Sequence, residues 1–431
     1  MSSVYVHGLG YVGLPTAAML ANYGHSVTGY DVDESLIQDL EDGRVTVDEP
    51  GLRAFVTEAL DSGNLDVTTE IGSAKYHIIS VPTPFDEETK TADVSYIEAA
   101  GRAIRPHLRA GDSVILESTV PPGTTVEVLQ PILEESGLAA GSDFALIHCP
   151  ETVLPGNIIT ELRENDRIIG GVNGVSTEAA VRLYESFVEG EIHTTTNATT
   201  AEFVKLIQNT YRDTNIALAN ELAKVAREYN IDSREAITLA NQHPRVELHQ
   251  PGPGVGGHCL PIDPWFLGQD SDTLELIPVA RRINDGMIDY TIDLLEDALG
   301  DIAGTTLAVL GVAYKGNVDD TRNSPGLRLA RRLQAIADEP MASVSPDGGE
   351  PASIEVRVTD PHVNDQTLAL QSLLEATTGA DAAIITTDHK EYTQLDPDAM
   401  AERMAGNVLI DTKAILEKPT WKAAGFTVES I

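Results

Sequence analysis

The fold is decided near the start of the chain, where Val4-Tyr5-Val6-His7 runs directly into Gly8-Leu9-Gly10-Tyr11-Val12-Gly13. The glycines of such a turn have separate uses. Gly8 permits the tight turn, Gly10 lets the backbone approach a pyrophosphate, and Gly13 lets a helix pack closely on the strand. A strand-like segment precedes the turn, a helical pattern follows it, and Asp31 ends the next strand-like segment. We therefore predict a dinucleotide-binding turn here.

Asp31 indicates which dinucleotide would bind. A carboxylate at this position accepts hydrogen bonds from the ribose diol and repels a 2′-phosphate, which favours NAD over NADP. The alternative is a glycine-rich turn that holds no ligand, and the surrounding strand, helix and acid argue against it. The segments around Thr83 and Thr119 also follow strand-like runs, where cofactor contacts gather in such sheets, although each alone is typical of an ordinary turn.

Outward from this turn the chain alternates short apolar segments with longer helical ones. Strand-like segments lie at residues 4–7, 26–30, 77–81, 113–117 and 144–148, and helical ones at 15–23 and 95–108. This alternation predicts a parallel sheet covered by helices on both faces. Residues 198–230 then have a helical pattern with no glycine or proline.

Strand-like segments return at 306–311, 355–359, 382–386 and 407–411, after helical residues 276–299. We predict an α/β protein with an N-terminal Rossmann domain (1–197), a central long-helix region (198–300) and a C-terminal Rossmann-like β/α domain (301–431). Residues 337–353 carry proline, glycine, serine and acids, and we expect a surface insertion there.

The composition excludes several classes of protein. The 431 residues include 67 acids and 29 basic residues, for a net charge of −38, which argues against a nucleic-acid binder. The acids are spread over the chain, so we interpret them as a hydrated surface suited to a salty cytosol. No apolar run reaches the roughly 20 residues of a membrane helix, and no signal peptide is recognised. The two cysteines suit a cytoplasmic protein, and we expect no metal site.

A second informative segment is Pro251-Gly252-Pro253-Gly254-Val255-Gly256-Gly257-His258-Cys259-Leu260-Pro261-Ile262-Asp263. Glycines before a cysteine can bring backbone close to a ligand and hold a thiol exposed. A lone cysteine is more often a small buried hydrophobe, but this glycine-rich context and the carboxylate of Asp263 favour a nucleophile. We expect His258 to be structural or to face solvent.

The predicted long helix carries Lys205, Asn209 and Arg212 (or Asp213) at helical spacing. A stripe of this kind is usually a solvated, salt-bridged face. Here the flanking residues are largely apolar, which favours the lining of a cleft.

Together these segments resemble the UDP-glucose/GDP-mannose dehydrogenase family. The resemblance rests on the N-terminal fingerprint, Glu117-Ser118-Thr119, Cys149-Pro150-Glu151, Lys205 with Asn209, and Gly256-Gly257-His258-Cys259, in order over nearly the whole chain. Arg212-Asp213, Asn241-Gln242-His243-Pro244-Arg245-Val246 and Asp263-Pro264-Trp265-Phe266 are most similar to the branch that oxidises UDP-N-acetyl-D-mannosamine.

The resemblance implies an NAD-dependent oxidation of a UDP-sugar CH2OH to a carboxylate by a homodimer. The C6 alcohol would lose a hydride to NAD, the resulting aldehyde would be captured by Cys259 as a thiohemiacetal, and a second hydride loss would give a thioester for hydrolysis. Lys205 would donate or stabilise a proton at the C6 oxygen, with Asn209 orienting it. Asp263 and Thr119 would position water, and Glu151 would assist hydrolysis.

The resemblance also implies binding residues. The expected NAD contacts, beyond the glycines, are Tyr11, Val12, Asp31, Thr83, Thr119 and Arg322. The expected substrate contacts are Thr152, Val153, Lys205, Asn209, Arg212, His243, Arg245, Gly256, Tyr314, Lys315 and Lys413. Thr152 departs from the branch, in which we expect an arginine at this position.

Other functions stay open from the sequence. The sugar could instead be UDP-glucose, UDP-N-acetylglucosamine or its galacto epimer, and the product could feed a surface polysaccharide or a glycoprotein glycan. Two-step β-hydroxyacid dehydrogenases share the N-terminal domain and long helix, but they lack the cysteine loop and the C-terminal domain. A regulatory protein that binds NAD without catalysis would be expected to have lost Cys259, Lys205 or Asp263, and all three are present.

Overall fold

The computed structural model describes residues 1–47, 49–338 and 353–431. In it the chain forms two compact units, residues 1–208 with 265–272 and residues 209–264 with 273–431. Most of the predicted insertion at 337–353 lies outside the described residues, and Ala337 and Asp338 end a helix. The three-part division of the chain stays a prediction.

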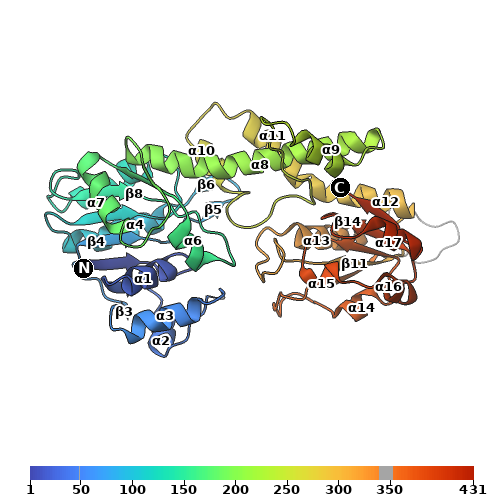
Figure 1. Cartoon of the computed structure of the whole chain (residues 1–431), viewed down its shortest axis with the longest axis horizontal. Coiled ribbons are helices and arrows are strands. Elements are labelled where there is room, and N and C mark those ends of the chain that lie inside the picture. The colour runs from blue at the N-terminus through green and yellow to red at the C-terminus, as the bar shows by residue number, and fades with distance from the viewer. Residues whose placement is uncertain (48, 339–352) are drawn as a thin grey trace. The chain divides into compact units, whose positions relative to one another are not determined.

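The first unit is built on an eight-stranded sheet in the order β10-β9-β8-β7-β4-β1-β2-β3 (Figure 1). Its strands are β1 Ser3–His7, β2 Ser26–Tyr30, β3 Leu65–Thr68, β4 Tyr76–Ile79, β7 Ser113–Leu116, β8 Ala145–His148, β9 Arg167–Gly171 and β10 Ile192–Thr194, with a separate hairpin of β5 Phe85–Asp86 and β6 Thr91–Ala92. Its helices are α1 Gly13–Asn22, α2 Glu34–Glu41, α3 Leu52–Asp61, α4 Ser95–Ile104, α5 Gln130–Glu134, α6 Ile158–Glu164 and α7 Gly174–Tyr184, with a 3-10 turn Arg105–His107 and a π-helix Thr124–Leu129.

Helices cover both faces of this sheet, as the alternation predicts. On β7, Val114 and Leu116 belong to one apolar core and Ile115 belongs to the core on the opposite face. Strand side chains alternate between faces, so a strand buried on both sides is apolar throughout. The sheet is not wholly parallel, because β9 pairs with β8 antiparallel, with Ile147 opposite Gly171.

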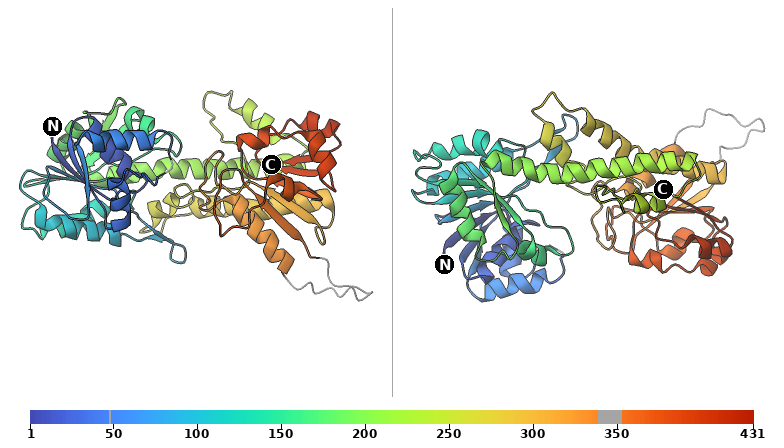
Figure 2. Two further views of the ribbon diagram at one scale, coloured as in Figure 1. Left: turned by 90° about the horizontal axis from the view of Figure 1, so that it is seen from below. Right: turned by 45° about the horizontal axis from the view of Figure 1, so that its top comes forward.

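Helix α8 (Ala198–Glu228) confirms the long helix predicted at 198–230 and appears as one unbroken rod in both views of Figure 2. It is followed by α9 Ser233–Ala240, α10 Asp263–Gly268, α11 Leu276–Asp285 and α12 Met287–Leu299. In the parts of the chain that the structure describes, no helix is long and apolar enough to cross a membrane.

The second unit contains a five-stranded parallel sheet in the order β12-β11-β13-β14-β15. Its elements are β11 Thr306–Leu310, α13 Pro325–Asp338, β12 Glu355–Thr359, α14 Leu373–Thr377, β13 Ala382–Ile385, α15 Lys390–Thr393, α16 Pro397–Arg403, β14 Val408–Asp411, α17 Lys418–Ala423 and β15 Thr427–Ser430. This sheet too is buried on both faces, because Leu307 and Val309 enter one core while Ala308 and Leu310 enter the other.

Each sheet has one point at which its strand order reverses. In the first sheet β1 pairs with both β2 and β4, and in the second β11 pairs with both β12 and β13. Ligands of open α/β sheets bind outside the carboxyl ends of the strands at such points. We therefore expect ligand-binding sites at the loops that follow β1 and β4 and at those that follow β11 and β13.

Candidate active site

The glycine turn after β1 has the geometry that its sequence predicts. Gly8 has φ +92°, and a Cβ there would lie 2.6 Å from the Ser80 carbonyl oxygen. A Cβ on Gly13 would lie 1.9 Å from the Gly8 carbonyl oxygen, so only glycine lets α1 start this close to the strand. Gly10 faces open space, with no atom within 4 Å of a Cβ position. The turn thus offers room for a ligand at Gly10 alone.

Asp31 lies beside this turn. Its carboxylate accepts a hydrogen bond from the Leu9 N–H at 2.8 Å and one from the Asp33 N–H at 3.1 Å. Val12 occupies the N-cap of α1 and has no side-chain acceptor, so the positive end of the helix is left to face a ligand. The Tyr11 hydroxyl instead donates to Glu49, which also accepts from the Gly156 N–H.

Two threonines lie at the ends of neighbouring strands, as predicted. Thr83 follows β4 and is buried, and its Oγ1 has no hydrogen-bond partner among the described residues. Thr119 follows β7 and is half-buried, next to Ser118, whose hydroxyl donates to the Val81 carbonyl at 2.7 Å. A buried hydroxyl without a partner costs free energy unless a ligand or water satisfies it. The open Gly10, the uncapped α1 and Thr83 together fit a dinucleotide.

Glu151 follows β8 inside a buried cluster that sequence reasoning did not find. Arg167, on β9, is 1% exposed and forms an ion pair with Glu151. Glu117 lies in the same cluster: burial first, and then the Glu151 carboxylate, raises its pKa. Tyr184 contacts Glu117 over 3.5 Å. The only sequence signal for this cluster is an arginine that opens the apolar strand β9.

The predicted substrate contacts Thr152 and Val153 come directly after this cluster. Both are half-buried, and the Thr152 N–H donates to Glu151 over 2.6 Å. Val153 packs against the apolar core of the first unit. The Glu151 carboxylate therefore has fixed partners on both of its oxygens.

The polar stripe of α8 points inward at two of its residues. Lys205 and Asn209 are 8% and 7% exposed, one helical turn apart. Asp213 continues the stripe but is committed to a buried ion pair with Arg281 at 2.5 Å and also accepts from Asn284. Arg212 is half-buried. Of the two residues left open by spacing, Asp213 is structural, and Arg212 stays the predicted substrate contact.

The cysteine loop holds its thiol at the surface, as predicted. Cys259 is exposed, and its carbonyl accepts from the N–H groups of Ile262 and Asp263, which starts the turn into α10. Asp263 is buried and accepts a 2.6 Å hydrogen bond from the Asn209 side chain. The structure thus places the thiol and the oriented carboxylate on one short turn. His258 is exposed, as expected.

The same loop packs against the loop after β11. A Cβ on Gly256 would lie 2.9 Å from the Tyr314 Cβ, and one on Gly257 would lie 3.0 Å from the Tyr314 ring. The Gly257 N–H donates to the Arg322 carbonyl at 2.8 Å. The guanidinium of Arg322 pairs with Asp320 and is 60% exposed. Four predicted residues (Gly256, Cys259, Tyr314 and Arg322) therefore belong to one pair of packed loops.

The remaining predicted basic contacts fall in two places of the second unit. Lys315 is half-buried beside Tyr314, and Lys413 follows β14 with its Nζ 3.5 Å from Asp388. His243 and Arg245 are exposed and line an open pocket of about 450 Å³ together with Tyr211. Both places present cations suited to an anionic ligand.

Three family models match the chain in order. They are the NAD-binding domain (residues 2–188), the central domain (199–286) and the UDP-binding domain (308–418) of the UDP-glucose/GDP-mannose dehydrogenase family. The glycine turn lies in the first, the inward face of α8 and the cysteine loop in the second, and Tyr314 with Lys315 in the third. NAD is thus the cofactor, held by the first of these domains.

Individual relatives agree over the full length. The chain is 42% identical to the UDP-N-acetyl-D-mannosamine dehydrogenase of Methanococcus maripaludis, over 100% of this chain and 96% of the relative. It is 39% identical to an NDP-N-acetyl-D-galactosaminuronic acid dehydrogenase of Ralstonia nicotianae, over 96% of each.

Solved structures show the same likeness. The structure of the UDP-N-acetyl-D-mannosamine dehydrogenase of Pyrococcus horikoshii matches with a TM-score of 0.90 and 41% identity, covering 100% of this chain and 99% of that one. That of a UDP-glucose dehydrogenase of Pyrobaculum islandicum matches with a TM-score of 0.83 and 27% identity, covering 100% and 97%. The chain therefore belongs to the UDP-glucose/GDP-mannose dehydrogenase family and is an NAD-dependent dehydrogenase.

Proposed function

We propose that the protein oxidises C6 of a UDP-N-acetylhexosamine to a carboxylate, with UDP-N-acetyl-D-mannosamine as its substrate. The proposal rests above all on full-length identity of 41–43% to several proteins named for that activity. The exposed thiol of Cys259 on the turn that carries Asp263 supports the covalent route.

The proposed reaction removes four electrons in two steps. The C6 alcohol gives up a proton and a hydride, and becomes an aldehyde. The Cys259 thiolate adds to the aldehyde carbon, and the tetrahedral thiohemiacetal gives up a second hydride to become a thioester. Water then attacks the thioester, which releases the carboxylate and restores the thiol. Bound NAD supplies the hydride acceptor for each oxidation, so one sugar yields two NADH.

Each predicted catalytic residue has a proposed role. Lys205 stabilises the developing negative charge on the C6 oxygen, and Asn209 orients it from a buried position one helical turn away. Asp263 and Thr119 position the water, and Asp263 is oriented for this by Asn209. Glu151, braced by Arg167, assists hydrolysis.

The proposed substrate contacts are the cationic and polar residues of the second unit together with Thr152, Val153 and Lys205. Tyr314, Lys315 and Lys413 would hold the UDP, since family membership assigns this part of the chain to UDP binding. Arg322 would reach the cofactor. Thr152 supplies a hydroxyl where an arginine is expected, so the sugar on this chain loses one charged contact.

The test is NADH release from the purified protein in high salt, with a panel of UDP-hexoses and UDP-N-acetylhexosamines. Two NADH per UDP-N-acetylmannosamine, and none with Cys259→Ala, are expected. Turnover of UDP-N-acetylgalactosamine alone would instead favour the activity for which the Ralstonia relative is named. Turnover of UDP-glucose alone would keep the mechanism and overturn the sugar. No turnover with any sugar, despite NAD binding, would favour a regulatory protein.

We also propose that the protein is a homodimer held by α8. Large apolar side chains are exposed at intervals of three, four and seven residues, which places them on one face of the helix. They are Phe203, Ile207, Tyr211, Leu218, Leu222 and Val225. Sedimentation should give a dimer, and Leu222→Glu a monomer. A monomeric wild-type protein in molar potassium chloride would overturn the proposal.

The charge supports a cytoplasmic protein adapted to salt. With a net charge of −38, self-repulsion is strong at low ionic strength and screened at high ionic strength. The unfolding midpoint should therefore rise between low salt and molar potassium chloride. An unchanged midpoint would contradict this.

A further inference from the structure

The loop of residues 312–317 follows β11 at the point where the order of the second sheet reverses, and it carries Tyr314 and Lys315. Both ends of this loop are held by side chains from the segments that follow two neighbouring strands, β12 and β13. Gly316 leaves no room for a side chain, since a Cβ there would lie 2.4 Å from the Asp388 carbonyl oxygen. The Thr387 hydroxyl donates to the Ala313 carbonyl at 2.8 Å. The loop is thus pressed against the segment that follows β13.

The start of the loop is held by Asp360, which follows β12. Its Oδ2 accepts hydrogen bonds from the N–H groups of Val312 and Ala313 at 2.7 and 3.0 Å, and its Oδ1 accepts from His362 and Val363. Burial alone would raise the pKa of Asp360, but these bonds and one from His389 hold it at about 2. The carboxylate is therefore ionised, and it tethers the start of the loop.

The end of the loop is held by His389, which is fully buried. Its Nδ1 accepts a 2.9 Å hydrogen bond from the Asn317 N–H, and its Nε2 lies 3.0 Å from Asp360 Oδ2. Because an N–H points at Nδ1, that nitrogen carries no proton and the ring is the neutral tautomer with its proton on Nε2. His389 thereby links the end of the loop to the carboxylate that holds its start.

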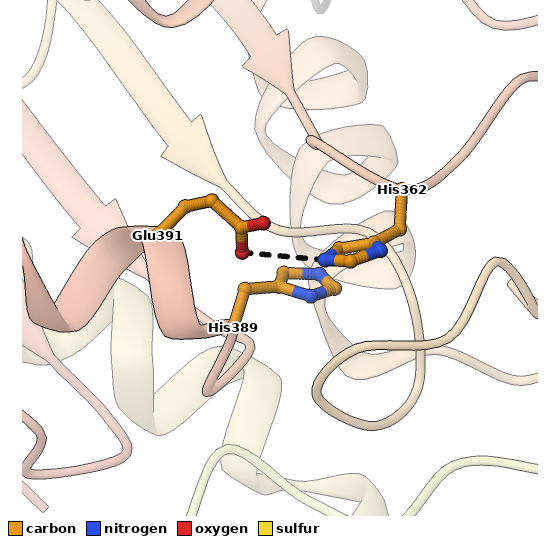
Figure 3. Close-up of side chains that lie close together, drawn as sticks. All are labelled: His362, His389 and Glu391. Atoms are coloured by element: carbon orange, nitrogen blue, oxygen red, sulfur yellow. Dashed lines mark hydrogen bonds and ion pairs between the residues drawn. The ribbon is translucent and has the colours of Figure 1, made fainter. Parts of the chain in front are cut away.

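His362, His389 and Glu391 lie close enough together to suggest a metal site, but their geometry argues against one. Figure 3 shows the two imidazole rings lying over one another. Their centroids are 4.8 Å apart, and their planes make an angle of 20°. The lone pairs of stacked rings lie in nearly parallel planes and cannot both point at one ion. Both His389 nitrogens also have protein partners. His362 instead pairs with Glu391 at 3.2 Å.

We propose that Asp360 and His389 are positioning residues that fix the loop of residues 312–317 in the conformation that binds the UDP part of the substrate. The inference rests on the proposed function, which assigns Tyr314 and Lys315 to that ligand. Asp388, next to His389, pairs with Lys413, so the same segment also holds a third proposed contact. A loop that is ordered before binding spares the ligand the entropic cost of ordering it.

Two variants separate the two bonds of His389. In His389→Asn the amide oxygen reaches about as far as Nδ1, so the variant keeps an acceptor for the Asn317 N–H. It loses the hydrogen bond to the Asp360 carboxylate. In His389→Gln the amide nitrogen reaches about as far as Nε2, so the variant keeps the hydrogen bond to Asp360. It loses the acceptor for the Asn317 N–H at the end of the loop. His362→Gln is the control, because its side chain touches neither end of the loop.

The probe is UDP itself, with the dissociation constant measured by calorimetry alongside that of NAD. His389→Gln should weaken UDP binding roughly three- to tenfold, the effect of one lost neutral hydrogen bond. His389→Asn and His362→Gln should bind UDP nearly as the wild type does. NAD binding should not change in any variant. With sugar, His389→Gln should raise KM and leave kcat unchanged.

Equal weakening in His389→Asn and His389→Gln would overturn the inference, because a merely structural role depends on the number of lost bonds and not on which bond is lost. Equal weakening in His362→Gln, reproduced by a chelator in the wild type, would instead indicate the metal site. A wild-type protein that binds no UDP would contradict the proposed function. Wild-type UDP binding with unaffected variants would contradict the positioning role alone.

Discussion

Asn209 donates a hydrogen bond of 2.6 Å from its side-chain nitrogen to Oδ2 of Asp263, which joins the inward face of α8 to the first residue of α10. Both side chains are buried. An amide at this position holds the carboxylate in one orientation without adding charge. The proposed water-positioning role of Asp263 therefore depends on Asn209.

Replacing Asn209 by alanine should lower kcat about 100-fold, within the range expected for loss of a positioned acid–base group. NAD binding should be retained, since the glycine turn is untouched. Steady-state kinetics with saturating sugar and NAD measure the effect. Gln208→Ala, at an exposed position one residue earlier on the helix, is the control and should have wild-type kcat. Equal kcat in the two variants would remove Asn209 from the mechanism.

The two cysteines should differ sharply in reactivity. Cys259 is exposed, whereas Cys149 is 1% exposed and burial raises the pKa of its thiol to about 12. Since the thiolate is the reactive form, iodoacetamide should alkylate Cys259 and inactivate the enzyme while Cys149 stays unmodified in the native protein. Peptide mass spectrometry during inactivation measures this. Cys149 labelling in step with loss of activity would contradict the assignment.

Much of the fold was predictable because its signals are local. The strand, the turn and the helix around Gly8 and Gly13 depend on residues adjacent in sequence, and β2 and β12 lie at the predicted bounds. The sequence does not predict the strands β3, β9, β10 and β15 or the short hairpin of β5 and β6. The antiparallel pairing of β9 could not be predicted, because it depends on how the chain returns from α6 and not on the strand itself.

The candidate site divides in the same way. Lys205 and Asn209 share a helical face, so their spacing predicts that they lie together. The partners that orient the site come from distant parts of the chain: Arg167 for Glu151, and Asp360 for the loop after β11. A single arginine or aspartate in a sequence does not show which residue it will meet. These pairings required the structure.

Glu117 should make the stability of the protein depend on pH in a definite direction. Burial, and then the Glu151 carboxylate, raises the pKa of Glu117 in the folded state. The folded protein therefore binds a proton that the unfolded chain releases. The contribution of Glu117 to the free energy of unfolding is fully present below its pKa in the unfolded chain. It is lost as the pH rises through its pKa in the folded protein.

Glu117→Gln removes this titration. It should therefore gain stability relative to the wild type as the pH rises from 5 to 9, by up to about 1.4 kcal/mol for each unit of pKa shift. Urea unfolding at fixed salt measures the difference. Glu178→Gln, which changes an exposed carboxyl on α7, should give a constant difference. A constant difference for Glu117→Gln as well would show that Glu117 is ionised in the fold.

His148 should have the opposite effect, at acid pH. It lies on β8, fully buried, and neither ring nitrogen has a hydrogen-bond partner among the described residues. Burial lowers the pKa of its ring from 6.5 to about 3. Below pH 6.5 the unfolded chain binds a proton at His148 that the folded protein does not bind. The contribution of His148 to stability is therefore fully present above that pH and is lost as the pH falls toward 3.

His148→Leu keeps the site apolar and removes the titration. Between pH 7 and pH 5 the wild type should lose up to about 2 kcal/mol that the variant retains, because each pH unit inside the window is worth about 1.4 kcal/mol. Urea unfolding at the two pH values, in constant potassium chloride, gives the comparison. His193→Gln, in a side chain that is 49% exposed on β10, is the control and should follow the wild type. A variant that loses as much stability as the wild type would mean that the acid sensitivity resides in another buried group, for which His7 and His77, hydrogen-bonded to each other at 3.1 Å, are the next to replace.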